Sequence, residues 1–198
     1  MNHDKEKYFA NKYRIASARH PRWDYGWNAA YFVTINTKNR ACYFGDVVDD
    51  KMQLSDIGLL VHRFWNEIPH HFSYVQLGAF VVMPNHMHGI IIINKPDDGR
   101  DVGDGQPGDG RDVETPKLGV STQTGAASQK WKPGSLGVII NQYKRVVTIR
   151  ARKIDTVFAW QPRFHDHIIR DENEYQRITN YIINNPLNWK DDTNTNRP

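Results

Sequence analysis

The histidines at positions 86 and 88 are spaced so that both could bind one metal ion. Their neighbours are largely aliphatic and predict a β-strand, in which side chains alternate between the two faces. His86 and His88 would then share a face, and imidazole is a common ligand of divalent cations. The same spacing recurs at His165 and His167, so the spacing alone is a weak signal. The alternative is that His86 and His88 are partly buried and satisfied by hydrogen bonds.

Tyr181 is a candidate nucleophile near the end of a predicted helix. Asn185 follows four residues later, so the two side chains would share one helix face. A phenol oxygen can attack phosphorus if a metal ion polarises the phosphate, and an amide oxygen can be a further ligand of a hard cation. The alternative is that Tyr181 packs in the core and that Asn184, Asn185 and Pro186 only end the helix.

Tyr143 is a rival nucleophile, because it also lies on a predicted helix. The helix is basic and carries Lys144, Arg145, Arg150, Arg152 and Lys153. A charged face of this kind is usually only solvated, but it can also contact the phosphates of a nucleic acid.

The composition limits the class of protein. The chain has 198 residues, 39% of them hydrophobic, which suits one domain with one sizeable core. A formal net charge of +4 and a pI near 9.1 favour a polyanionic partner. Cys42 is the only cysteine, which excludes an internal disulfide and a cysteine-rich zinc site. Residues 90–93 are too short an aliphatic run to span a membrane, and residues 1–10 do not resemble a secretory signal, so we expect a cytoplasmic protein.

The order of the predicted elements indicates how the candidate residues are positioned. β-branched and aromatic segments predict strands at 30–36, 74–83, 86–93 and 164–170. Apolar residues at helical spacing predict helices at 55–68, 135–153 and 171–185. This order predicts a ferredoxin-like α+β fold: an antiparallel sheet with helices on one face and an extra C-terminal helix that carries Tyr181.

Local signals set the ends of these elements. Ser55 is a candidate N-cap of the first helix, and Pro69 is expected to stop it. Pro84 and Asn85 predict a tight turn between two strands. The apolar stripe of the first helix is expected to consist of Leu59, Leu60, Phe64 and Ile68.

Two segments do not contribute to the predicted core. Residues 1–28 interleave basic and aromatic side chains and are expected to form an irregular arm. Residues 96–129 are rich in Gly, Asp, Ser, Thr and Pro and repeat the sequence DGRDV, which is typical of a flexible insertion. We treat the whole chain, residues 1–198, as one domain that contains these two segments.

Three segments together resemble the REP-associated tyrosine transposases, which are HUH-type single-tyrosine enzymes. VVMPNHMHGIIII is similar to their HUH hairpin, in which an aliphatic strand and a Pro-X turn precede His-X-His. WQPRFHDHIIRDENEYQRITNYIINNPLNW resembles their C-terminal signature, which ends in Tyr-Ile-X-X-Asn-Pro, and YFVTINTKNR resembles their first strand. Order and spacing match from about Tyr13 to Trp189. His165, where the family suggests an aromatic residue, and the insertion depart from the pattern.

The resemblance implies a transposase that cuts and joins DNA through a 5′-phosphotyrosine intermediate. Position by position, His86 and His88 match the metal-binding pair, Asn185 matches the third ligand of Mg²⁺ or Mn²⁺, and Tyr181 matches the nucleophile. At Tyr143 the family usually has an aromatic residue that serves packing.

The implied partner is single-stranded or hairpin-forming repeat DNA, bound by a monomer or homodimer. Bases are expected to stack on aromatic residues of the arm such as Trp23 or Trp27. Other candidate DNA-binding residues are Arg14, Arg19, Arg22, Lys144, Arg145, Arg150 and Arg152.

Two other classes of protein remain open. One is a ferredoxin-like module that binds single-stranded nucleic acid and cuts nothing, although such a module would not need His86, His88, Tyr181 and Asn185 together. The other is a metal-dependent nuclease in which water attacks, and a covalent tyrosine–DNA adduct would exclude it. If the resemblance holds, the histidine pair and Asn185 should converge on one site.

Overall fold

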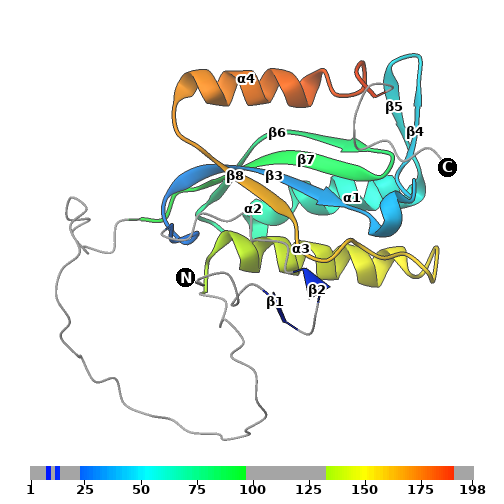
Figure 1. The fold of residues 1–198 in the computed structure, drawn as a ribbon, viewed down its shortest axis with the longest axis horizontal. Helices are drawn as coiled ribbons and strands as arrows, with labels where there is room; N and C mark the ends of the chain where they lie inside the picture. Colours follow the sequence, from blue (N-terminus) through cyan, green and yellow to red (C-terminus); the bar gives the residue numbers. More distant parts are fainter. Residues whose placement is uncertain (1–7, 10–11, 14–22, 97–132, 190–198) are drawn as a thin grey trace, which may run out of the picture.

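The structure, a computed structural model, describes residues 8–9, 12–13, 23–96 and 133–189. Its centre is an antiparallel sheet with the strand order β6-β7-β3-β8 (Figure 1). The strands are β3 (Ala29–Asn36), β6 (Val75–Met83), β7 (His86–Ile93) and β8 (His165–Ile169). This order and the helices between the strands confirm the predicted ferredoxin-like α+β fold.

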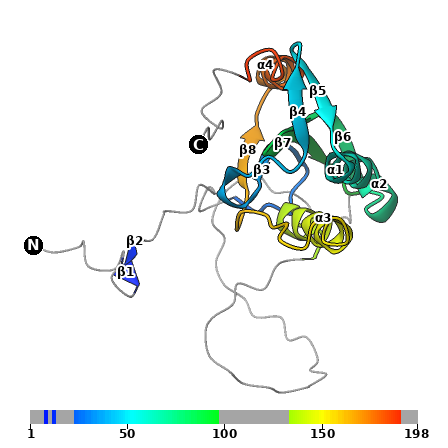
Figure 2. The same cartoon turned by 90° about the vertical axis from the view of Figure 1, so that its right-hand side faces the viewer.

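Helices lie on both faces of the sheet. α1 (Asp56–Asn66), the short α2 (Ile68–His71) and α3 (Leu136–Ala151) lie on one side, and α4 (Glu172–Ile183) lies on the other (Figures 1 and 2). α4 is the extra C-terminal helix that the sequence predicts. None of the helices in the described part of the chain is long and apolar enough to cross a membrane.

The main hydrophobic core lies between the sheet and helices α1 and α3. Alternate residues of β3 and β7, such as Val33 and Ile91, are completely buried there. Gly89 allows α1 to approach β7 closely, because a β-carbon at that position would lie 2.4 Å from the Trp65 ring. Burial of each large side chain in this core stabilises the fold by about 1.5–3 kcal/mol.

A smaller core lies between α4 and the opposite face of the sheet. It consists of Ile90, Ile169 and Ile182, with Phe32 and Ile178 packed against them. Ile90 is in phase with the alternate residues 86 and 88 of the same strand. The two histidines of β7 therefore lie on the face that α4 covers.

The first helix begins where the sequence predicts but ends earlier. Ser55 is its N-cap, and the Ser55 hydroxyl accepts a hydrogen bond of 3.1 Å from the Gly58 N–H, as expected. The helix ends at Asn66, however, and Pro69 does not stop it. Pro69 lies in the first turn of α2, where its missing N–H costs nothing.

The predicted apolar stripe is only partly right. Ile68 is buried and Phe64 packs against the core, but Leu59 is 55% exposed, and α1 itself buries Ile57, Val61 and Trp65. Both sets have helical spacing and lie on adjacent stripes of the helix, so periodicity could not decide which one faces the sheet.

The sequence prediction missed a hairpin between β3 and α1. Strands β4 (Gly45–Val48) and β5 (Lys51–Leu54) pair with each other. Asp49 and Asp50 form the turn with φ values of 48° and 59°, the left-handed conformation that two-residue hairpin turns of type I′ require.

Part of the predicted arm is described. β1 (Tyr8–Phe9) pairs with β2 (Lys12–Tyr13), so this part is not irregular. Arg14, Arg19 and Arg22 lie outside the described residues.

Residues 97–132, which contain nearly all of the predicted insertion, also lie outside the described residues. The two chain segments that flank them are adjacent. A β-carbon built at Gly134 would lie 3.2 Å from the Lys95 ammonium. The Asn28 side chain fixes the first flank, because it accepts a hydrogen bond of 2.8 Å from the Lys95 N–H and donates one of 3.0 Å to the Lys95 carbonyl. A short connection can therefore join the two flanks.

Candidate active site

The histidine pair is buried between β7 and α4. His86 is completely buried and His88 is 2% exposed, and their Nε2 atoms are 3.1 Å apart. The other ring nitrogen of each has a partner: Nδ1 of His86 lies 2.8 Å from Asn85 Oδ1, and Nδ1 of His88 lies 2.8 Å from Thr34 Oγ1. An amide oxygen only accepts, so the contact with Asn85 favours the tautomer of His86 that has its proton on Nδ1 and a lone pair on Nε2. This is the form in which an imidazole binds a metal ion through Nε2.

Burial also keeps His86 neutral. Loss of solvation, and then the positive charge of Arg40, lower the pKa of His86 to about 3. At neutral pH the ring is therefore unprotonated and able to donate a lone pair.

Tyr181 comes to this pair from α4. Its Oη atom lies 3.3 Å from His88 Nε2, and its ring makes an edge contact with Phe32 at 6.2 Å between centroids. Tyr181 is 43% exposed, so a substrate in solution can reach part of its side chain. The structure thus joins a predicted metal ligand and the predicted nucleophile across 93 residues of sequence.

Asn185 lies in the turn that follows α4, two residues beyond the helix rather than on it as predicted. It is 2% exposed, and its Oδ1 atom has no hydrogen-bond partner. Four residues before it, Tyr181 contacts His88; four residues after it, Trp189 stacks on His86 with ring centroids 6.0 Å apart. The segment from Tyr181 to Trp189 therefore contacts both histidines, and Asn185 lies at its middle.

The donor set fits a divalent cation. Two nitrogens 3.1 Å apart can both reach one ion, since metal–nitrogen bonds are about 2.1 Å long. A buried amide oxygen without a partner costs about 1–3 kcal/mol, and a cation would remove that cost. The described residues contain no cluster of three or more His, Cys, Asp or Glu that could hold a metal.

The start of α4 has a defined cap and one close contact with the sheet. Asp171 is the N-cap and accepts a hydrogen bond of 2.8 Å from the Glu174 N–H. Near the same end, Tyr175 lies against β6 at Gly78, where a β-carbon would be 2.7 Å from the Tyr175 hydroxyl. Gly78 is in an irregular part of β6 between Leu77 and Phe80.

Tyr143 lies on the other side of the sheet. Its hydroxyl donates to the Val61 carbonyl and to Met87 Sδ, each at 3.0 Å, and the side chain is 4% exposed. Burial raises the pKa of Tyr143 well above its ordinary value. Tyr143 is therefore a core residue, with neither the exposure nor the ionisation that a nucleophile needs.

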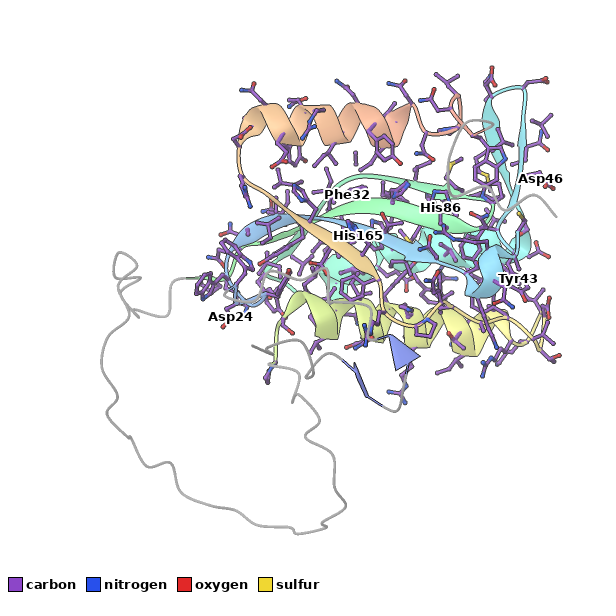
Figure 3. All side chains as sticks on the ribbon, viewed as in Figure 1. Asp24, Phe32, Tyr43, Asp46, His86 and His165 are labelled. Atoms are coloured by element: carbon purple, nitrogen blue, oxygen red, sulfur yellow. The ribbon has the colours of Figure 1, made fainter. Side chains whose placement is uncertain are left out.

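The second histidine pair is at the surface. His165 and His167 are exposed on β8, an edge strand of the sheet (Figure 3). His167 Nε2 lies 2.8 Å from Glu174 Oε1, so this pair faces water and a carboxylate rather than a buried amide.

The basic residues of α3 do not surround the histidine pair, because α3 covers the opposite face. The Lys144 ammonium donates to the carbonyls of Gln161 and Arg163, each at 2.8 Å, and burial lowers the pKa of Lys144 to about 8. A phosphate would have to compete with these two carbonyls, which lie in the segment after α3, for the Lys144 ammonium.

The other predicted DNA-binding residues differ in how accessible they are. Arg145 and Arg150 are exposed, and the exposed Arg152 donates through Nε to the Phe158 carbonyl at 3.1 Å. Trp23 is partly buried, and its indole N–H donates to the Tyr31 hydroxyl at 3.1 Å.

The four-stranded antiparallel sheet and its helices have the fold of a REP-associated tyrosine transposase. The solved structure of such a transposase bound to a REP hairpin aligns with a TM-score of 0.54 and 20% identity, over 86% of this chain and 74% of the other.

By sequence, the chain belongs to the same family as an uncharacterized protein of Haemophilus influenzae. The two are 37% identical over 187 residues, which cover 94% of this chain and 96% of that protein. No family model matches the chain.

Proposed function

We propose that this protein is a metal-dependent transposase that cuts and rejoins single-stranded DNA through Tyr181. The observation that carries the proposal is the 3.3 Å separation between Tyr181 Oη and His88 Nε2. His86 Nε2 lies 3.1 Å from the same His88 nitrogen. A phenol oxygen on a partly exposed side chain, beside a pair of imidazole rings, could attack a phosphodiester.

The proposed metal ion is Mg²⁺ or Mn²⁺, held by His86, His88 and Asn185. When bound, it would act as a Lewis acid that polarises the phosphate and neutralises developing negative charge. The support is the neutral state of His86 and the unsatisfied Oδ1 of Asn185.

In the proposed reaction, Tyr181 loses its proton to solvent and its oxygen attacks phosphorus. The bond from phosphorus to the 3′-oxygen breaks, and that oxygen takes up a proton. The protein is then linked to the 5′-phosphate, and the free 3′-hydroxyl can reverse the step or a different 3′-hydroxyl can replace it. Because one phosphoester replaces another, no ATP is needed, and the sequence contains no P-loop motif.

The proposed partner is single-stranded or hairpin-forming repeat DNA. The support is the likeness to a transposase solved with a REP hairpin and the net charge of +4. Arg145 and Arg150 are exposed on α3, which lies on the side of the sheet away from α4 and Tyr181 (Figure 1).

Formation of a covalent adduct tests the proposal. The protein is incubated with a single-stranded hairpin oligonucleotide labelled on the 3′ side of the cleavage site, with Mn²⁺ or Mg²⁺ and with a chelator. We expect a labelled species that keeps the mass of the protein plus DNA after denaturation, only when metal is present.

The two alternatives give other results. Cleavage without an adduct would indicate a nuclease in which water attacks. Binding without cleavage in either metal, across hairpin and unstructured oligonucleotides, would indicate the non-catalytic module.

The adjacency of Lys95 and Gly134 leads to a further prediction. A chain in which a short Gly/Ser linker replaces residues 97–132 should fold and keep its metal-dependent cleavage, because the flanks are already side by side. We expect an unfolding temperature within a few degrees of the full-length value in a thermal melt, and cleavage within about threefold. A large loss of either would show that the replaced segment has a structural or substrate-binding role.

A further inference from the structure

The turn after β3 contains two consecutive residues in the left-handed conformation. β3 ends at Asn36, and in the 3-10 turn η2 (Lys38–Arg40) the φ values of Asn39 and Arg40 are 55° and 57°. Asparagine tolerates this conformation better than most residues, but in arginine the β-carbon crowds the following carbonyl oxygen. Glycine would avoid the strain, so arginine occupies position 40 at a conformational cost. Strain of this kind is concentrated at functional sites.

The turn directs the Arg40 side chain back towards the histidine pair. Arg40 Nη1 donates to Asn36 Oδ1 at 2.7 Å. Asn36 is directly opposite His86 in the register of β3 and β7, and opposed residues in a sheet share a face. The guanidinium group therefore lies at the His86 end of the candidate site, and its charge contributes to the lowered pKa of His86.

The position suits an anionic ligand. Arg40 is only partly exposed, so its charge is less screened than that of an arginine in full solvent. A guanidinium has five N–H donors in one plane, and the bond from Nη1 to Asn36 Oδ1 orients that plane. A planar donor group of this kind matches the geometry of phosphate oxygens, which are the anionic groups of a nucleic acid.

We propose that Arg40 binds a backbone phosphate of the single-stranded DNA substrate beside the histidine pair. The proposal rests on the proposed function for the identity of the ligand. The DNA backbone would then run along the site from Arg40, past His86 and His88, to Tyr181. In the sequence Arg40 is only the last residue of the first-strand segment YFVTINTKNR, and no local pattern there predicts the turn that brings its side chain back.

The salt dependence of DNA binding tests this contact. Binding of a labelled single-stranded oligonucleotide is measured in chelator at several salt concentrations for the wild type and for Arg40→Gln. Loss of one phosphate contact should reduce the slope of log affinity against log salt by about 0.7 and weaken binding by roughly tenfold. The matched control is Arg63→Gln, which should change neither quantity. Arg63 is exposed on α1, on the other side of the sheet from Tyr181, and pairs with Glu67 four residues later.

A second variant separates DNA binding from a purely structural role. Arg40→Gly removes the guanidinium and also relieves the left-handed strain. We expect an unfolding temperature at or above that of Arg40→Gln, together with the same reduced salt slope. If Arg40 only anchors the turn, both variants should unfold at a lower temperature and keep the wild-type slope, and that result would overturn the proposal.

The test does not depend on cleavage. If the wild type forms no covalent adduct but the Arg40 variants lose salt-dependent binding, the proposed reaction fails and the Arg40 contact stands. If an adduct forms and the folded Arg40 variants keep the wild-type slope, the reaction stands and the contact fails. A wild-type protein without measurable salt-dependent binding also overturns the contact.

Discussion

Replacing Tyr181 with phenylalanine is expected to abolish both DNA cleavage and the covalent adduct, while folding and DNA binding persist. The substitution keeps the ring contacts with His88 and Phe32 and removes only the oxygen that lies 3.3 Å from His88 Nε2. Loss of a nucleophile should reduce the cleavage rate by at least about a thousandfold. The measurement is the rate of adduct formation on the labelled single-stranded hairpin with Mn²⁺.

Tyr143→Phe is the matched control, since it makes the same chemical change on the other side of the sheet. It removes the hydrogen bonds to the Val61 carbonyl and Met87 Sδ, so we expect about 1 kcal/mol less stability and little change in cleavage. An active Tyr181→Phe protein together with an inactive but folded Tyr143→Phe protein would contradict the assignment of the nucleophile. Residual cutting without an adduct in Tyr181→Phe would indicate that water attacks.

Removing a proposed metal ligand should have the second large effect. We expect His88→Ala and Asn185→Ala each to weaken Mn²⁺ binding by at least about a hundredfold, since even loss of a residue that only orients a ligand costs about 10–100-fold. Mn²⁺ affinity is measured by titration calorimetry, and metal-dependent cleavage is measured in parallel. His165→Ala is the control, because it changes a histidine of the exposed pair.

The stability of these variants, measured with metal and with chelator, tests the ligand role of Asn185 independently of cleavage. At a hundredfold excess over its Kd, the metal should stabilise the wild type by about 2.7 kcal/mol. Asn185→Ala should lose most of this gain, yet in chelator its unfolding temperature should hardly fall, because the substitution removes a buried oxygen that has no partner. A large loss of stability in chelator, with unchanged metal affinity, would mean that Asn185 is only a structural residue.

The sequence predicted the sheet and the histidine pair because both depend on local patterns. Alternation fixed the strand and the shared face of His86 and His88 before any contact was known. The contact between Tyr181 and His88 could not follow from spacing, since it depends on which face of the sheet α4 covers. The family resemblance supplied that pairing.

The features that the sequence did not predict depend on interactions between distant segments. Lys144 stays a candidate DNA-binding residue, and its sequence context does not show that its ammonium donates to the carbonyls of Gln161 and Arg163. The β4–β5 hairpin was missed because its turn uses Asp49 and Asp50, without the glycine that usually marks a two-residue turn.

The attachment of α4 is slight for a helix that carries a nucleophile. Ile182 is its only buried residue among the described side chains, and Tyr175 and Ile178 add partial contacts with the sheet. Beyond the helix, the Trp189 ring adds a contact with His86. A segment with so little burial opens locally at a lower free energy than the strands beneath it.

Such an opening would act on the whole site at once. Tyr181 and Asn185 belong to the same segment, so local unfolding withdraws both and leaves His86 and His88 on the sheet. The candidate site then exists in an assembled and a half-assembled population. The assembled fraction scales the apparent affinity for metal and the rate of cleavage together, so residues that only hold α4 in place influence both.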